Sequence, residues 1–333
     1  MKAISVVFLL ALLVPFSVFA SGDSQRPFNE ARDQYYSMLV NGEFQRLEIE
    51  AQNAREKSLV LDDGQPRLAA LYAGTSGCLT SGCQNTLTKE EWDRRLKRLK
   101  EWVETNPDSI TASVALATYY LEYGWSVRGS GYRDTVREDA WPIFRKNTDK
   151  AKTDLQALGG RAKNDPGWYT SLLRVARSQG WPLREFDDVY NEAVKRFPGY
   201  IPLYFEKAQY LAPRWWGSRE EFKKYVEEVT NETDQIMGKT LYARLNWLVY
   251  TNDMFSNGQA NWSEMKNGFD RIVKDYPHPW NINNYAKFAC LARDAETFAA
   301  LEQKIDGHPI LVAFGGDQEW YEWCRKTMVP RRH

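Results

Sequence analysis

The sequence of 333 residues has little histidine and no excess of either charge. It contains three histidines, and its 44 Lys and Arg residues balance 44 Asp and Glu residues. Nucleic acids and anionic membranes attract proteins with a basic surface field, and this chain has no net charge to supply one. We therefore expect no nucleic-acid partner. Tetrahedral zinc sites need four nitrogen or sulfur ligands, so the scarcity of histidine also argues against a metal. We expect no other cofactor.

Signatures of catalysis are absent as well. The chain has no Gly-x-Ser-x-Gly elbow, no His-Glu-x-x-His helix and no phosphate-binding loop. His278 and His308 each precede a proline, as turn residues do. Acidic doublets such as Glu90-Glu91 occur, but nothing in the sequence places two carboxylates at the separation a glycosidase requires. A non-catalytic binding protein is favoured. The alternative is a cell-envelope enzyme that acts on glycans.

Only the start of the chain has a long hydrophobic run. Lys2 precedes an apolar stretch from Ile4 to Val14, and Val18-Phe19-Ala20 fits the positions that a signal peptidase reads. We expect residues 1–20 to be a signal peptide, although an uncleaved anchor is an alternative. After cleavage we expect no membrane insertion, and a secreted or periplasmic protein.

Cysteine is scarce, and its four residues fall into two pairs. Cys78 and Cys83 lie in a Gly- and Ser-containing loop, whereas Cys290 and Cys324 lie in later predicted helices. Thiols outside the cytoplasm tend to be oxidised. Each pair is therefore a candidate disulfide, the second of which would attach the last helix. The alternative is buried free thiols.

Alternation of apolar and polar residues, typical of strands, is also missing. Only Ile310–Phe314 resembles a strand, and it has no partner strand. Between residues 165 and 213, apolar residues instead recur every three or four positions, and Gly or Pro ends each series. This pattern predicts two short amphipathic helices followed by a third. The fold class we expect is all-α.

The helical pattern repeats within the chain. Val194–Pro198 corresponds to Val273–Pro277, and prolines follow Asn106 and Asp165 at similar boundaries. Proline cannot continue a helix, so it marks the end of a unit. Such units predict stacked helical hairpins that cover one another's apolar faces. We divide the mature chain into an N-terminal helical segment with the cysteine loop, residues 21–87, and a helical-repeat domain, residues 88–333.

Several helix ends can be predicted from local residues. Thr88 and Glu91 have the spacing of a capping box, and Ser218 begins a second one. We expect one helix to end at Gly124-Trp125 and a long helix to run from about Arg133 to Leu158.

The repeat also resembles known proteins. The spacing of Gly180, Ala193 and Pro198 resembles degenerate tetratricopeptide repeats, which implies an α-α superhelix, or solenoid. From Trp102 to Arg325 the chain is similar to a bacterial family of unknown function related to tetratricopeptide-like proteins. The segments that carry this resemblance are Gly124–Tyr132, Asp165–Tyr169, Leu211–Ser218 and Phe288–Asp294. It implies an all-helical fold and no particular activity.

Two arginine-bearing loops are the main candidate sites. Arg128-Gly129-Ser130-Gly131 precedes the long predicted helix, whose N-terminal N–H groups could hold a carboxylate or another anion beside Arg128. The alternative, which sequence alone favours, is a tight turn in which Arg128 pairs with a neighbouring acid or caps a helix end.

The second loop is Arg214-Trp215-Trp216. A ring and the guanidinium group could stack on a peptide or a sugar. The sequence again favours the alternative, in which one tryptophan fills the space between helical pairs and Arg214 covers it. Trp125, Tyr132 and Trp168 complete the set of candidate contacts. We expect a protein or peptide partner on a concave surface that contains aromatic residues, and a small-ligand receptor is a third possibility.

Overall fold

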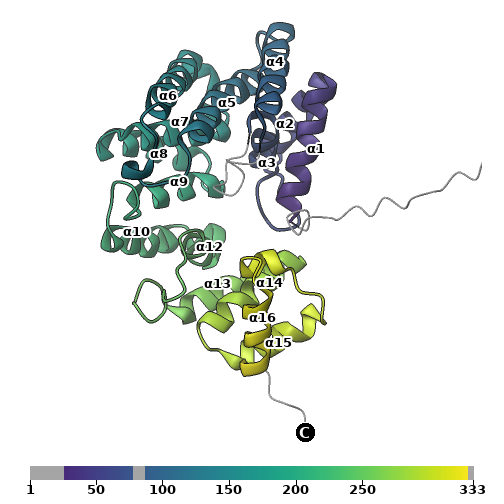
Figure 1. Ribbon diagram of the computed structural model, residues 1–333, viewed down its shortest axis with the longest axis vertical. Helices are drawn as coiled ribbons and strands as arrows, with labels where there is room; N and C mark the ends of the chain where they lie inside the picture. The colour runs from purple at the N-terminus through teal and green to yellow at the C-terminus, as the bar shows by residue number, and fades with distance from the viewer. Residues whose placement is uncertain (1–25, 78–86, 329–333) are drawn as a thin grey trace, which may run out of the picture.

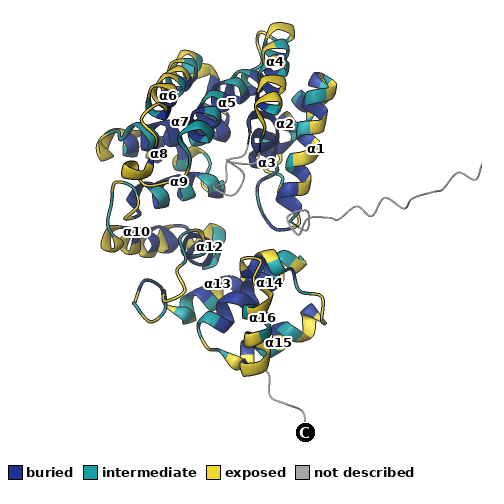
Figure 2. Ribbon diagram, viewed as in Figure 1, coloured by how far each residue is buried: buried dark blue, intermediate teal, exposed yellow. Residues whose placement is uncertain are grey.

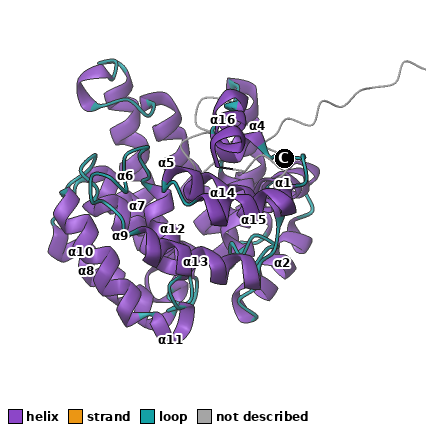
Figure 3. Cartoon of the chain, turned by 90° about the horizontal axis from the view of Figure 1, so that it is seen from below, coloured by secondary structure: helices purple, strands orange, loops and turns teal. Residues whose placement is uncertain are grey.

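The computed structural model describes residues 26–77 and 87–328 (Figure 1). Helices and loops make up these two ranges, and no strand is found in them (Figure 3). A single antiparallel bridge joins Val60 to Pro66. The all-α prediction is therefore confirmed. The predicted signal peptide and the Cys78–Cys83 pair lie outside the described residues.

The described chain contains sixteen α-helices and three 3₁₀ turns. In chain order they are α1 (Pro27–Asn41), α2 (Phe44–Glu56), α3 (Arg67–Ser76), α4 (Lys89–Thr105), α5 (Ile110–Arg128), η2 (Arg133–Thr135), α6 (Ala140–Leu158), η3 (Gly159–Ala162), α7 (Pro166–Gln179), α8 (Leu183–Arg196), α9 (Ile201–Leu211), α10 (Arg219–Glu232), α11 (Asp234–Met237), α12 (Thr240–Leu248), α13 (Trp262–Asp275), α14 (Pro279–Leu291), α15 (Ala295–Ile305), η4 (Leu311–Phe314) and α16 (Gln318–Met328).

Several predicted helix ends are confirmed. Thr88 and Glu91 form a capping box, in which each side chain accepts from the other residue's backbone N–H. Ser218 accepts from the N–H of Glu221 at the start of α10. Gly180 ends α7 in the left-handed conformation that glycine adopts readily. The residues that determine these helix ends are close to one another in the sequence.

Two predictions near irregular segments are wrong. Helix α5 does not end at Gly124-Trp125 but continues to Arg128, and Gly124 instead lets α5 pack closely against the backbone of Phe144. The long helix α6 begins at Ala140 and not near Arg133, where a 3₁₀ turn lies. Residues 311–314, the only segment that resembles a strand in the sequence, form a 3₁₀ turn, and the described chain contains no strand that could pair with them.

The helices form an inner and an outer row. In the inner row, α3, α5, α7, α9 and α12 contact one another in succession. Outer helices such as α4, α8 and α10 contact it and carry many exposed residues (Figure 2). The buried positions of α4 are Trp92, Arg95, Leu99 and Trp102, a single stripe at helical spacing. By contrast, α5 is buried around most of its circumference.

The backbone repeats its conformation where outer helices end. Asn106, Phe197 and Tyr276 each precede a proline, and each follows the last residue of α4, α8 or α13. Their φ and ψ angles are −131° and 65°, −130° and 61°, and −134° and 74°. Three of the four proline boundaries seen in the sequence therefore share one recurring turn. The fourth differs, because Asp165 has φ and ψ angles of −115° and 110° and Pro166 is the first residue of α7.

The loop that joins α2 to α3, which we call the Asp63 loop (residues 57–66), reaches the C-terminal half. The backbone oxygen of Asp63 accepts from Arg244 Nη2 of α12 and from Asn281 Nδ2 of α14, both at 3.2 Å. Gly64 has a φ of +79°, and a Cβ there would lie 2.7 Å from Arg244 Nη2 and from the Tyr276 ring. These contacts join segments about 180 to 220 residues apart.

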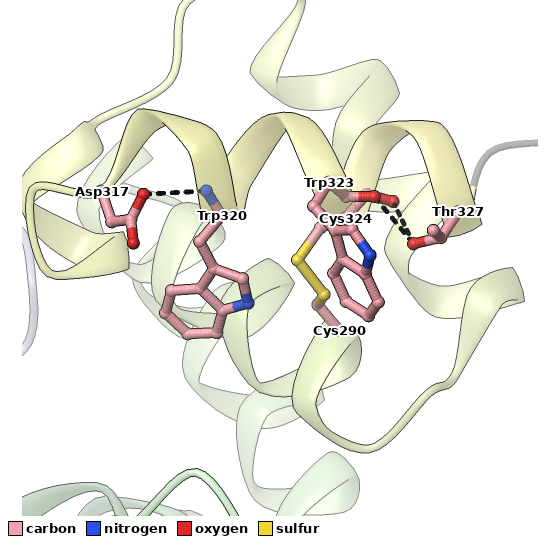
Figure 4. Close-up of a disulfide and its surroundings, with 6 residues drawn as sticks. All are labelled: Cys290, Asp317, Trp320, Trp323, Cys324 and Thr327. Carbon is pink, nitrogen blue, oxygen red and sulfur yellow. Dashed lines mark hydrogen bonds between the residues drawn. A yellow bond between two sulfur atoms is a disulfide. The ribbon is translucent and has the colours of Figure 1, made fainter.

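The C-terminal helices are joined by a disulfide. Cys290 of α14 bonds to Cys324 of α16, and both residues are buried (Figure 4). Asp317, the residue before α16, accepts from the backbone N–H of Trp320 in the first turn of the helix. The bond holds α16 against α14, as expected for this cysteine pair.

Candidate functional site

The two arginine-bearing loops meet on one surface. Arg214 Nη2 donates to the backbone oxygen of Ser130, which is 84 residues earlier in the chain. The Arg214 guanidinium also lies 5.2 Å from the centre of the Tyr132 ring. The structure thus gathers six of the seven candidate contact residues, and we call them the Arg–Trp cluster. Its members are Trp125, Arg128, Tyr132, Arg214, Trp215 and Trp216.

Arg128 is the last residue of α5 and stacks on aromatic rings. Its guanidinium lies 4.8 Å from the Trp125 ring and 5.1 Å from the Trp141 ring. Its Nη1 donates to the backbone oxygens of Gly129 at 3.0 Å and Gly131 at 3.1 Å. Because α6 begins only at residue 140, this loop does not form the candidate anion site at a following helix N-terminus, the interpretation that the sequence had not favoured.

Trp125 and Trp215 anchor the cluster in the interior. Trp125 is buried, and its indole N–H donates to Ser178 Oγ at 3.0 Å. The half-buried Trp215 packs edge-to-face against it, with ring centres 5.4 Å apart, and the Arg177 guanidinium lies 4.3 Å from the Trp215 ring. Trp215 is therefore the tryptophan that fills the space between helices.

Trp216, Tyr132 and Arg214 form the accessible part of the cluster. The exposed fractions of Trp216 and Tyr132 are 56% and 64%, and Arg214 is also exposed. Trp216 is held from beneath, because its indole N–H donates to the Arg177 carbonyl at 2.8 Å. A Cβ on Gly180 would lie 2.5 Å from the Trp216 ring, so the ring rests directly on this glycine.

Trp168, the seventh candidate, lies elsewhere. It belongs to the first turn of α7, whereas Arg177 and Ser178 belong to the last. Its indole N–H donates to the Leu155 carbonyl at 2.8 Å, and its ring packs edge-to-face on Tyr169. Only 6% of Trp168 is exposed, so its role here is packing between α6 and α7.

A buried group of four charges lies behind the cluster and was not predicted from the sequence. Arg174 pairs with Glu122, and Arg177 pairs with Glu206, with Nη2 and Oε2 of the second pair 2.9 Å apart. Burial raises the pKa of Glu122 to about 7, while Arg174 opposes the rise. The sequence did contain an indication of this buried group, because Glu122 is the only acidic residue in the mainly apolar α5.

A small cavity adjoins the buried charges, and a larger groove lies among the C-terminal helices. One, of about 40 Å³, is lined by Arg174 and Glu206 together with Tyr72 and Tyr200. The other is a groove of about 350 Å³ between α13 and α15, bordered by both charge signs. None of the acidic doublets of the sequence lines either cavity.

Comparison with known proteins gives no match to a protein family, to a curated protein or to a solved structure. No described helix has both the length and the apolar character needed to cross a membrane. Within residues 26–77 and 87–328, no three His, Cys, Asp or Glu side chains gather as a metal site would require.

Proposed function

We propose that this chain is a non-catalytic binding protein that contacts a protein or peptide partner through the Arg–Trp cluster. One observation carries the proposal: Tyr132, Arg214 and Trp216 are exposed on a cluster that has a buried aromatic anchor. Trp, Tyr and Arg are the residue types most enriched among energetically dominant interface positions.

The way in which the exposed groups are held supports this function. Arg214 is fixed by the Ser130 carbonyl, and Trp216 by the Arg177 carbonyl and the surface of Gly180. Little side-chain entropy is then lost when a partner orders these groups, which reduces a main cost of association.

The proposal includes a fold class and a location. A tetratricopeptide-like superhelix is supported by the two rows of helices and by the recurring turn at Asn106, Phe197 and Tyr276. Export to the periplasm or the medium is supported by the apolar start of the sequence and by the Cys290–Cys324 disulfide.

An envelope enzyme acting on glycans is the second candidate, and one observation favours it. The raised pKa of Glu122, with Glu206 close enough to contribute, is typical of an acid–base pair. However, each carboxylate already pairs with an arginine, and the adjoining cavity of about 40 Å³ is far smaller than usual ligand pockets. Binding is therefore the better supported function.

Site-specific photocrosslinking tests the proposal. Benzoylphenylalanine replaces Tyr132 in one variant and the similarly exposed Ile236 of α11 in a control variant. Both proteins are irradiated in envelope extracts after their folding has been checked by circular dichroism. We expect a discrete crosslinked partner only with the probe at position 132.

The substitution Arg214→Ala in the same background should weaken that crosslink. Equal crosslinking from positions 132 and 236, or none at 132, would contradict the proposed contact surface. Release of sugar fragments from envelope glycan by the wild-type protein, and its loss in Glu122→Gln, would favour the enzyme instead.

A further inference from the structure

Two guanidinium groups bind the same three-residue turn. Arg128 donates to the carbonyls of Gly129 and Gly131, and Arg214 donates to the carbonyl of Ser130 between them. Carbonyl oxygens carry only partial negative charge, so they orient the two side chains without neutralising them. The pKa of Arg128 is lowered, first by burial and then by the positive charge of Arg214.

The bonds within the protein leave most of the donors unused. An arginine side chain has five N–H donors in a planar fork. Among the described residues, Nε and Nη2 of Arg128 have no acceptor, and the same is true of Nε and Nη1 of Arg214. Arg214 is exposed and Arg128 partly so, which leaves donors that a ligand can meet.

The buried Arg95 and Arg244 also donate to backbone oxygens, but three other arginines are treated differently. Arg174, Arg177 and Arg55 each pair with a carboxylate, from Glu122, Glu206 and Asp165 respectively. In the part of the chain that the structure describes, no carboxylate lies within 4.0 Å of the Arg128 or Arg214 guanidinium. Asp139, which lies a few residues beyond this turn, is paired with Arg137.

Resting on the function proposed above, we infer that the bound partner is an acidic peptide segment whose carboxylate lies between Arg128 and Arg214, with an adjoining side chain against Tyr132. An arginine fork matches a carboxylate in a bidentate manner. The unmatched positive charge of the turn is what selects an acidic partner over a neutral one.

Selection from a peptide display library tests this inference and does not require an identified partner. Random peptides are selected against the wild-type protein and against Arg214→Gln, Arg214→Glu and Arg184→Gln. Arg184 is an exposed residue of α8, so its substitution is a control of equal charge change. Arg128→Gln is added only if its melting temperature matches the wild type, because Arg128 also packs on rings.

We expect wild-type and Arg184→Gln proteins to select peptides rich in Asp and Glu. A representative selected peptide should bind Arg214→Gln roughly tenfold or more weakly, because a charge-assisted hydrogen bond is lost. Arg214→Glu should lose the preference for acids and gain one for Lys and Arg. Replacement of each acid by its amide, and amidation of the C-terminus, show whether a side chain or the chain end supplies the carboxylate.

Two failures can be told apart. Peptides that lose binding in Tyr132→Ala, but show no enrichment in acids, would overturn the inference and keep the cluster as the contact surface. Peptides that bind every cluster variant equally would overturn both the inference and the proposed function. Capture of acidic glycans through Arg214, without any selected acidic peptide, would also overturn the assignment of a peptide.

Discussion

Lys287 of α14 is a buried amine that packs against aromatic rings. Only 3% of the residue is exposed, and its Nζ lies 3.7 Å from the centre of the Tyr250 ring and 4.6 Å from that of Phe288. Burial lowers its pKa from 10.5 to about 7. Contact with the rings stabilises the charged form but does not replace the lost water.

This lysine should make the protein more stable as pH rises above 7. In that range the unfolded chain binds a proton at Lys287 that the folded chain has released, so the free energy of unfolding increases by up to ~1.4 kcal/mol per pH unit. We predict that Lys287→Met raises the melting temperature at pH 7 and reduces this slope between pH 7 and 9. The exposed Lys274→Met is the control. An unchanged slope in Lys287→Met would refute the prediction.

The Glu122–Arg174 pair should be costly to break from one side. Removal of Arg174 leaves a buried carboxylate without its partner, and such changes cost about 3 to 5 kcal/mol. We predict that Arg174→Met loses this amount in chemical denaturation at pH 7, whereas Glu122→Leu with Arg174→Met loses clearly less.

The pH dependence of the single variant gives a second check. The folded-state pKa of Glu122 is already raised from 4.5 to about 7, so protonation favours the folded chain as pH falls through that window. Arg174→Met should therefore regain part of its stability between pH 7 and 4.5. A loss that does not change with pH would mean that packing, and not the charge, accounts for the effect.

At the scale of single elements, the disulfide fixes the position of α16. It closes a loop with a sequence separation of 34, for which restriction of the unfolded chain gives roughly 4 kcal/mol. We predict that Cys290→Ala with Cys324→Ala lowers the free energy of unfolding by about 2 to 5 kcal/mol. Amide hydrogen exchange should show the largest loss of protection in α16. Equal exchange in α16 and in the distant α4 would contradict this local role.

Helix ends could be predicted where one residue type has one local function. Thr88, Ser218 and the residues before proline fall in this group, because capping and proline geometry depend on near neighbours. The different roles of Gly180 and Gly124 cannot be predicted from their near neighbours. The first ends α7 with a positive φ, whereas the second allows α5 to approach α6, and only the packed structure shows which role applies.

The residues of the candidate site could be predicted from the sequence, but their arrangement in space could not. Arg128 and Arg214 stand out in the sequence through their glycine- and tryptophan-containing loops, yet their meeting at Ser130 depends on how α5 and α9 flank α7. Trp168 shares the composition of the other candidates and is buried at the opposite end of α7. Residue type alone does not distinguish an anchor from a contact.

At the scale of the molecule, the Asp63 loop joins the first helices to the last ones. Helices α10 and α12 lie between the group α1–α9 and the group α13–α16 (Figure 1), and the Asp63 loop provides a second connection through Arg244 and Asn281. The two groups of helices are therefore connected both by the chain through α10 and α12 and by the contacts of the Asp63 loop.

A glycine substitution can test this second connection. Gly64 and Gly258 have φ angles of +79° and +73°, but a Cβ would meet Arg244 and Tyr276 at position 64 and nothing within 4 Å at position 258. We predict that Gly258→Ala costs about 1 kcal/mol, for the backbone conformation alone. Gly64→Ala should cost roughly 1 to 3 kcal/mol more because of overpacking, and should increase the radius of gyration in small-angle scattering. Equal losses of stability in both variants would argue against a structural role for the contact.

The contact of the Asp63 loop with Arg244 and Asn281 also constrains the order in which parts of the chain can fold during synthesis. Asp63 is made early, while Arg244 and Asn281 emerge from the ribosome about 180 and 220 residues later. Until then the Asp63 carbonyl lacks both of these donors, so the loop cannot make its contacts with α12 and α14. Completion of the fold therefore requires residues made late in synthesis to reach a loop that was made early.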